Sequence, residues 1–338
     1  MIQPILSSTK ITLNSPGKIN LHLAIGQKRA DGFHELESIF AALDFADTLT
    51  FSLLPGNKAE TQLILQEEGP YRKLSQKGQI FTLFPKENNI VYLAIELFRS
   101  KTGFSGNIRA ELVKRIPPCS GLGGGSSNAA ATLLALNNLL FSDTSPFSIE
   151  EMLDMAAQLG SDVPFFIEIT RKNPKQSSTR AVKGRGEQFF FLPPLQSLGV
   201  LLVFPGFSSH TSPAFKLLDE KRLLSSEKQP SDFQFRLNNP WSPPNSWDFS
   251  NDFEKLFLDH GTEQEKNTYR TMLTDLKKAG AAFTGLSGSG SACFGIFDTP
   301  EDAKQAEKKL SGSFYALKST FFLRNNKNQL YNIANRRG

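Results

Sequence analysis

Cysteine is scarce in this chain of 338 residues, which contains only two. Cys119 and Cys293 lie far apart, each inside a glycine-rich segment, and neither has metal-ligand spacing to a histidine. Two cysteines cannot form the disulfide framework of a small secreted domain. We therefore expect small, unpaired cysteines in a buried position or a loop.

Long apolar runs are also missing, since none approaches the ~20 residues that a membrane-spanning helix needs. The first twenty residues lack the basic start, apolar stretch and cleavage site of a signal peptide. These absences predict a cytoplasmic protein with no membrane partner.

A strong charge of one sign is absent as well. The net charge of +5 comes from 38 basic against 33 acidic residues, which suits anionic ligands but does not indicate nucleic-acid binding. The densest basic cluster lies in the turn-rich segment 170–187, which we interpret first as a solvated loop. Its members are Lys172, Lys175, Arg180, Lys183 and Arg185.

The order of expected elements favours an α+β fold. Residues 18–26 alternate strictly between apolar and polar, which predicts a strand with Lys18 and Asn20 on its polar face. Further strands are expected at 47–55, 107–117, 199–206 and 314–324, and two more, joined by a glycine-serine turn, within 281–297. Helices are expected at 88–103, 149–160, 268–280 and 301–310. Because these alternate irregularly, α+β is favoured over a doubly wound sheet. Length predicts about two domains, which we place at 1–195 and 196–338, with an irregular insertion at 220–247.

The segment "GLGGGSSNAA", which begins at Gly121, places a glycine loop at the start of a helix. Glycines allow close approach of backbone amides, and a helix start adds unpaired N–H groups and a positive dipole end. The segment has neither the lysine of a Walker loop nor the spacing of the dinucleotide fingerprint. A phosphate cradle is the favoured interpretation, with a flexible linker or tight turn as the structural alternative.

Lys18 and Asp162 complete the set that phosphoryl transfer needs. Asp162 follows an expected helix in "LGSDVPFF", and an isolated aspartate there could simply cap the next turn. A lone lysine such as Lys18 is usually solvated, yet it could instead neutralise an anion. Beside a phosphate cradle, the aspartate could accept a hydroxyl proton while the lysine offsets the developing charge.

Two further segments could belong to the same site. "GLSGSGS", residues 285–291, is either a plain hairpin turn or a second phosphate-binding loop. "RADGFHELES", residues 29–38, is either a hairpin with a packed Phe33 or a ligand-binding segment.

Together, "SPGKINLHL", "PPCSGLGGGSSNAA", "LGSDVPFF" and "GLSGSGSACFGIF" resemble the motifs of the galactokinase, homoserine kinase, mevalonate kinase and phosphomevalonate kinase superfamily. Their order and spacing match over nearly the whole chain. The resemblance implies a two-domain small-molecule kinase fold. Its N-terminal part is like the second domain of ribosomal protein S5, its C-terminal part is ferredoxin-like, and the active cleft lies between them.

Within the superfamily, "KINLHLAIGQKRADGFHELES" is most similar to members acting on a cytidine-diphosphate-linked methylerythritol in the non-mevalonate isoprenoid pathway. The implied reaction is phosphorylation of the 2-hydroxyl by ATP. The implied catalytic residues are Asp162 as base and Lys18 as its partner. The implied ATP-binding residues are Gly121, Leu122, Gly123, Gly124, Gly125, Ser126, Ser127 and Asn128, with Lys114 and Asn89 on the adenosine side.

The same resemblance implies the residues that bind the acceptor. Asn20 would contact it near the reacting hydroxyl, and His34 would hydrogen-bond the cytosine between the rings of Phe33 and Phe215. Thr211, Gly288 and Ser289 would lie nearby. Phe33 replaces the tyrosine usual in the family, which keeps the stacking face and loses a hydroxyl. The second loop has serines, Ser287 and Ser289, where the family usually has threonine.

Mg²⁺ is expected with ATP, but no carboxylate in the matched motifs is an evident ligand, so its ligands are left open. A monomer or weak homodimer is expected. Three alternatives remain: a superfamily kinase with another acceptor, a catalytically silent ligand sensor, and an RNA-binding protein. "ADGFH" favours a pyrimidine, and the presence of both Lys18 and Asp162 disfavours the sensor. The basic segment 170–187 is poor in aromatics, which disfavours RNA, and it could instead be a lid near the substrate diphosphate.

Overall fold

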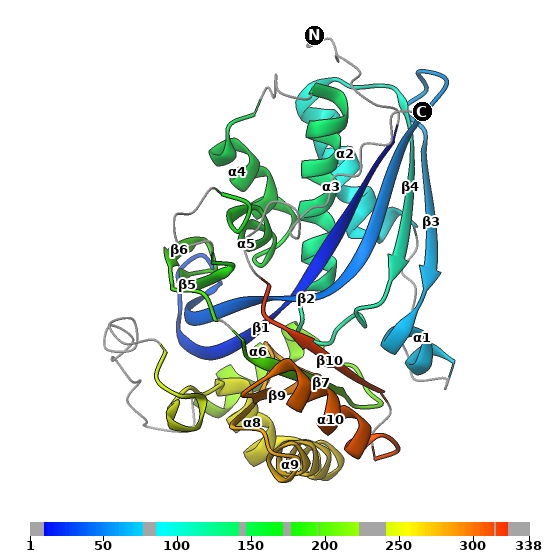
Figure 1. Ribbon diagram of the computed structural model, residues 1–338. Helices are drawn as coiled ribbons and strands as arrows, with labels where there is room; N and C mark the ends of the chain where they lie inside the picture. Colours follow the sequence, from blue (N-terminus) through cyan, green and yellow to red (C-terminus); the bar gives the residue numbers. More distant parts are fainter. Residues whose placement is uncertain are drawn as a thin grey trace.

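The protein is described by a computed structural model that covers residues 10–76, 86–141, 147–171, 177–195, 197–222, 241–313 and 316–323. Two sheets organise it, and Figure 1 shows them as two stacked parts with helices on their outer sides. One sheet has six strands and the other has four. The mixed content of helices and antiparallel strands confirms the α+β prediction.

The six-stranded sheet is built on one long antiparallel hairpin. Strand β1 (Lys10–Lys28) pairs with β2 (His34–Leu54), and the turn between them contains Gly32, with φ of 84°. The sheet order is β3-β4-β2-β5-β6, with β1 also paired to β2. The remaining strands are β3 (Thr61–Glu67), β4 (Asn107–Lys114), β5 (Thr179–Gly184) and β6 (Gln188–Phe191).

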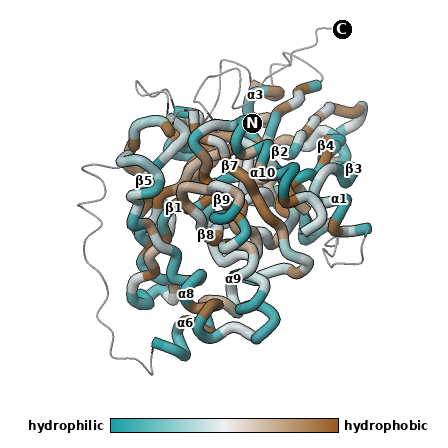
Figure 2. The backbone as a smooth tube through the Cα atoms, turned by 60° about the horizontal axis from the view of Figure 1, so that its bottom comes forward, coloured by the Kyte–Doolittle hydropathy of each residue, from teal (hydrophilic) through white to brown (hydrophobic). Residues whose placement is uncertain are grey.

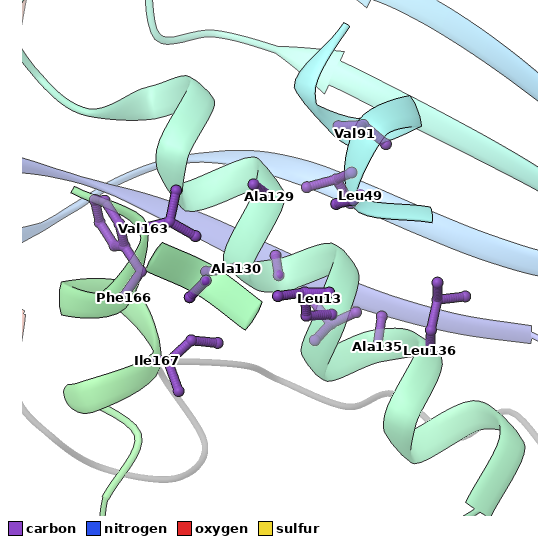
Figure 3. Close-up of a cluster of buried hydrophobic side chains, with 14 of the residues drawn as sticks. Leu13, Leu49, Val91, Ala129, Ala130, Ala135, Leu136, Val163, Phe166 and Ile167 are labelled. Atoms are coloured by element: carbon purple, nitrogen blue, oxygen red, sulfur yellow. The ribbon is translucent and has the colours of Figure 1, made fainter. Parts of the chain in front are cut away.

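Helices pack on one face of this sheet around an alanine-rich helix, α3 (Gly124–Phe141). Small side chains such as Ala129 and Ala130 allow α3 to lie close to β1, and Leu13 and Phe166 fill the space beside it (Figure 3). The other helices of this part are α1 (Gly69–Ser75), α2 (Ile90–Thr102), α4 (Ile149–Leu159) and α5 (Val163–Glu168), with a short 3-10 helix at Lys86–Asn88.

The four-stranded sheet has the order β10-β7-β9-β8, and all of its pairings are antiparallel. Its central strands are the most hydrophobic part of this region, and the outer helices carry hydrophilic segments (Figure 2). The strands are β7 (Gly199–Phe204), β8 (Phe283–Leu286), β9 (Cys293–Phe297) and β10 (Ala316–Phe321). The helices are α6 (Thr211–Arg222), α8 (Asp252–His260), α9 (Glu263–Lys278) and α10 (Pro300–Leu310), with a 3-10 helix at Pro244–Ser246.

The helices expected at 88–103, 149–160 and 301–310 are confirmed as α2, α4 and α10. Ser148 and Glu151 form a capping box at the start of α4, and Gly160 follows its last turn. Gly103, with φ of 71°, ends α2, and Thr299 caps α10. Cys119 and Cys293 are both unpaired, as expected. No helix in the described ranges is long and apolar enough to cross a membrane.

The prediction of one long solvated loop at 170–187 is wrong, because β5 lies inside it and pairs with β2. Arg180 is 0% exposed and lies 3.7 Å from Glu168, so this arginine is a core residue. Burial lowers the pKa of Arg180 to about 10 despite the nearby carboxylate of Glu168. Lys172 and Lys175 lie outside the described residues. The expected insertion at 220–247 also begins too early, since Glu220 still belongs to α6, and residues 223–240 are not described.

Candidate active site

A cavity of about 920 Å³ lies where the two halves of the chain meet. Its wall includes the end of the β1–β2 hairpin, the first glycine loop, the start of α6 and the second glycine loop. This volume is in the upper range of small-molecule sites. Every site residue predicted from the sequence lines this cavity, with Ser127 as the exception.

The two glycine loops touch each other at the cavity wall. Gly121 has φ of 76°, and a Cβ atom added to it would lie 1.9 Å from the carbonyl oxygen of Ser287. The Ser287 hydroxyl donates a hydrogen bond of 2.9 Å to the carbonyl of Gly121. Glycine is therefore required at this position by both conformation and space. The contact supports the interpretation of the second loop as part of one site, beyond a plain hairpin turn.

The first loop leads directly into the amino end of α3. Gly124 is the first helical residue, so the orphan N–H groups and the positive dipole end belong to the loop itself. Ser126 lines the cavity from the first turn, whereas Ser127 is buried and its hydroxyl accepts a hydrogen bond of 2.8 Å from Ser15. We infer that Ser127 fixes α3 against β1, and only its neighbours are open to a ligand.

Lys18 and Asp162 form an ion pair, with 3.1 Å between Nζ and Oδ2. Asp162 lies at the N-cap position of α5 but makes no side-chain cap hydrogen bond, so the capping alternative is wrong. Lys18 is only 3% exposed, and its ammonium also donates 2.7 Å to Asn20 and lies over the Phe40 ring. The side chain of Asp162 is 32% exposed and lines the cavity, so its carboxylate is accessible to a ligand.

The polar face of β1 is covered, because Asn20 and His22 are also buried. Asn20 accepts from Lys18 and donates 3.0 Å to the Ser38 hydroxyl of β2. Strand pairing thus places Lys18 in a largely desolvated position, where ionic hydrogen bonds are stronger than in water.

Asp47 is a functional candidate that the sequence did not reveal. It is 0% exposed and accepts hydrogen bonds of 2.7 and 2.8 Å from the backbone amides of Arg115 and Ile116. Its other oxygen contacts the Lys114 ammonium and accepts 3.0 Å from Asn128. This carboxylate therefore fixes two predicted ATP-binding residues, one from each side of the glycine loop.

Asn89 has a structural task as well as a place in the cavity wall. Its side-chain oxygen accepts 2.9 Å from Val91 and caps α2, which leaves the amide NH₂ for a ligand. Lys114 and Asn89 therefore flank one end of the cavity, beside the first glycine loop.

His34 lies in another part of the cavity wall, which β2 and α6 form. Its Nε2 lies 2.7 Å from Oδ1 of Asp219, and its ring stacks on Phe215 with 4.8 Å between centroids and an interplanar angle of 21°. Burial raises the pKa of Asp219, but hydrogen bonds from His34 and Lys28 outweigh it, so the pKa is lowered overall. Asp219 is the second carboxylate that sequence reasoning missed, and it orients the histidine predicted to read a base.

Phe33 lies at the hairpin turn and is 47% exposed. It lines the cavity together with His34 and Phe215. Thr211, at the start of α6, shares a hydrogen bond of 3.0 Å with Ser289 of the second loop. The adjacent Gly288 is held through its carbonyl by Asn251, at 2.8 Å. The predicted acceptor-binding residues are thereby gathered in one region.

A metal ion would find few protein ligands here. In the described part of the chain, no group of three or more His, Cys, Asp or Glu side chains is arranged to hold one. The Ser126 hydroxyl is the loop group that fits a Mg²⁺ ion carried by phosphate oxygens and water.

The two family models that match the chain are the GHMP kinases N terminal domain, over residues 89–168, and the GHMP kinases C terminal domain, over residues 249–316. Among solved structures, a 4-(cytidine 5'-diphospho)-2C-methyl-D-erythritol kinase has a TM-score of 0.66 at 26% identity and covers 92% of this chain and 98% of its own. The mevalonate kinase of L. major has a TM-score of 0.60 at 16% identity, covers 96% and 99%, and supports the fold alone. The fold and the site thus define a GHMP kinase.

Curated relatives narrow the class further. A 4-diphosphocytidyl-2-C-methyl-D-erythritol kinase of Thermodesulfovibrio yellowstonii is 34% identical over 308 residues, which cover 89% of this chain and 95% of the relative. The kinase of the same description from Protochlamydia amoebophila is 33% identical over 333 residues, which cover 98% and 96%. The chain belongs to the 4-diphosphocytidyl-2-C-methyl-D-erythritol kinase family.

Proposed function

We propose that the chain transfers the γ-phosphate of ATP to the 2-hydroxyl of 4-diphosphocytidyl-2-C-methyl-D-erythritol, a step toward isoprenoid precursors. The observation that carries the proposal is the joining of two recognition ends in one cavity. The first glycine loop and the Lys18 to Asp162 pair line one part of its wall, and His34, Phe33 and Phe215 line another. A cytidine joined to a polyol through a diphosphate needs both kinds of contact, because its base and its reacting hydroxyl lie at opposite ends of the molecule.

In the proposed reaction, the acceptor hydroxyl gives its proton to the carboxylate of Asp162 as its oxygen bonds to the γ-phosphorus. The bond between that phosphorus and the bridging oxygen of ADP breaks, and ADP leaves with the electron pair. Lys18, with its Nζ atom 3.1 Å from Oδ2 of Asp162, orients the carboxylate and offsets negative charge in the transition state.

The loop from Gly121 to Gly125 would hold the ATP phosphates through its amides and the dipole of α3. Lys114 and Asn89 would bind ATP beside that loop, and Asn20 would contact the acceptor near its hydroxyl. Mg²⁺, held mainly by phosphate oxygens and water with Ser126, would neutralise phosphate charge when bound.

The base of the acceptor would lie against Phe33 and Phe215 and form a hydrogen bond with Nδ1 of His34, because Asp219 engages Nε2. Phe215 stacks on His34, so the imidazole ring is already held nearly parallel to the Phe215 ring before the base binds. Such preorganisation lowers the ordering cost of binding. Thr211, Gly288 and Ser289 complete this wall.

Three coarser predictions accompany this function. The boundary between residues 195 and 196 is supported by the change from the first sheet to β7 of the second. A cytoplasmic location is supported by two cysteines that form no disulfide. A monomer or weak homodimer remains a prediction.

An ADP-release assay with several acceptors tests the function. We expect turnover with 4-diphosphocytidyl-2-C-methyl-D-erythritol and none above background with mevalonate or homoserine. Turnover with either of the latter alone would contradict the proposed acceptor while leaving the kinase class intact.

A further inference from the structure

The cavity has five cationic side chains of lysine or arginine among its described lining residues. Three of them are already paired with carboxylates: Lys18 with Asp162, Lys28 with Asp219 and Lys114 with Asp47. Within the described ranges, Arg185 and Lys216 have no carboxylate oxygen within 4.0 Å of their cationic nitrogens. These two carry the uncompensated positive charge of the cavity wall.

Arg185 is the better placed of the two. Lys216 is an exposed residue of α6, whereas Arg185 is half-buried in the tight turn between β5 and β6. Its guanidinium lies over the ring of Phe33, with 4.9 Å from Cζ to the centroid. A planar cation held on an aromatic ring loses little entropy when it binds an anion.

The turn that carries Arg185 reaches both ends of the proposed acceptor. The Gly186 backbone packs against the carbonyl of Ser161, since a Cβ atom added there would lie 3.1 Å from that oxygen. Ser161 directly precedes the proposed base, Asp162. The turn of Arg185 therefore links the segment that carries Asp162 with the ring of Phe33.

The conformation of the turn is held by its own backbone. The amide of Arg185 donates 2.6 Å to Glu187, and Gly184 and Gly186 have φ of 74° and 120°. The Glu187 carboxylate thus binds the backbone amide of Arg185 and forms no ion pair with its guanidinium. The geometry predicts a fixed backbone and a side chain that can turn from Phe33 toward an anion.

We propose that Arg185 binds the diphosphate of the acceptor, an inference that rests on the proposed function. In a molecule that joins a nucleoside to a polyol, the diphosphate occupies the middle, where this residue lies. Arginine suits phosphate oxygens because its N–H groups bind two of them at once. In the proposed reaction Arg185 takes no part in proton or phosphoryl transfer, so its role is affinity and positioning.

The test compares CDP with cytidine as ligands, measured by calorimetry with a non-hydrolysable ATP analogue saturating the nucleotide site. We expect Arg185→Met to weaken CDP by about tenfold or more, as for a lost charge-assisted contact, and to leave cytidine within about twofold. Arg185→Lys should restore part of the CDP affinity. Equal losses for CDP and cytidine would mean that Arg185 only supports Phe33 and would overturn the proposal.

Lys183→Met is the matched control, since Lys183 lies two residues earlier on β5, pairs with Glu37 at 3.4 Å and does not line the cavity. It removes the same charge and should leave both affinities unchanged. A CDP loss as large as that of Arg185→Met would assign the effect to net charge and overturn the proposal.

Turnover distinguishes this inference from the function on which it rests. If the unaltered chain phosphorylates the cytidyl acceptor and Arg185→Met has the same KM, the inference fails and the function stands. If the unaltered chain does not phosphorylate this acceptor, both fail. We expect a raised KM for the acceptor and an unchanged KM for ATP.

Discussion

The two ends of the cavity are built from different materials. At the phosphate end, carboxylates and cations are paired and mostly buried, as in the contacts of Lys18 with Asp162 and of Lys114 with Asp47. At the base end, the pair of Lys28 with Asp219 is more exposed and lies beside aromatic side chains, of which Phe33 is 47% exposed. The difference indicates that the first end is preorganised for charge and transfer, while the second selects by shape and stacking. Substitutions at the two ends should therefore alter different kinetic constants.

The largest effect is expected at Asp162. Asp162→Asn removes the proton acceptor but preserves size, so kcat should fall by about a thousandfold while the affinities for ATP and acceptor change little. Steady-state kinetics and calorimetry would measure the two. A loss of ATP affinity as large as the loss of kcat would contradict the role of Asp162 as the base. It would also contradict the claim that the two ends of the cavity control different kinetic constants.

A second break is expected at Gly121. Gly121→Ala places a methyl group against the Ser287 carbonyl and strains φ, so kcat/KM for ATP should fall by about a hundredfold. Gly125→Ala is the comparison, because the added methyl group would have Ile90 as its nearest neighbour, at 3.8 Å, and alanine favours the helix. Equal losses in the two variants would show that the contact between the loops is unimportant.

At the base end, Asp219→Ala should raise KM for the acceptor by about tenfold and leave kcat nearly unchanged, since His34 loses the acceptor at 2.7 Å that orients it. Lys28→Met keeps that hydrogen bond and should have a smaller effect. Because hydrogen bonds from His34 and Lys28 outweigh burial and lower the pKa of Asp219, its contact with His34 should persist to a lower pH than an ordinary aspartate would allow. A change in kcat without a change in KM would contradict the role of this residue.

The smallest effects are expected at Phe33. Phe33→Ala should raise KM for the acceptor by about fivefold, since one stacking face is lost. Phe33→Tyr keeps the face and should stay within about twofold of the unaltered chain. If the alanine variant bound cytidine as tightly as the unaltered chain, stacking at this ring would be excluded.

Much of this arrangement could be predicted because its residues lie in distinctive local patterns. Lys18 follows a proline and a glycine on an alternating strand, and Asp162 precedes a proline after a helix. Glycine loops are also recognisable from composition. The α+β class followed from irregular alternation of helical and strand periodicities.

The missed residues lack such patterns. Asp47 lies within a strand and belongs to no recognisable motif, and its role depends on backbone amides of Arg115 and Ile116 that approach only in the folded sheet. Asp219 occupies a helix where an aspartate is usually solvated. Strand β5 was missed because Arg180 and Lys183 made the segment appear hydrophilic, although Arg180 is compensated by Glu168 in the core. The positions of Asp47, Asp219 and Arg180 all depend on contacts with residues that are not their neighbours in the sequence.

The most direct measurement is a crystal structure with a non-hydrolysable ATP analogue and the cytidyl acceptor together. We predict that the acceptor 2-hydroxyl lies about 2.6–3.2 Å from the carboxylate of Asp162. The γ-phosphate should lie at the loop that begins at Gly121, and the pyrimidine should lie between Phe33 and Phe215. An acceptor bound in the reverse direction, with its pyrimidine at the glycine loop and its polyol at His34, would contradict this prediction.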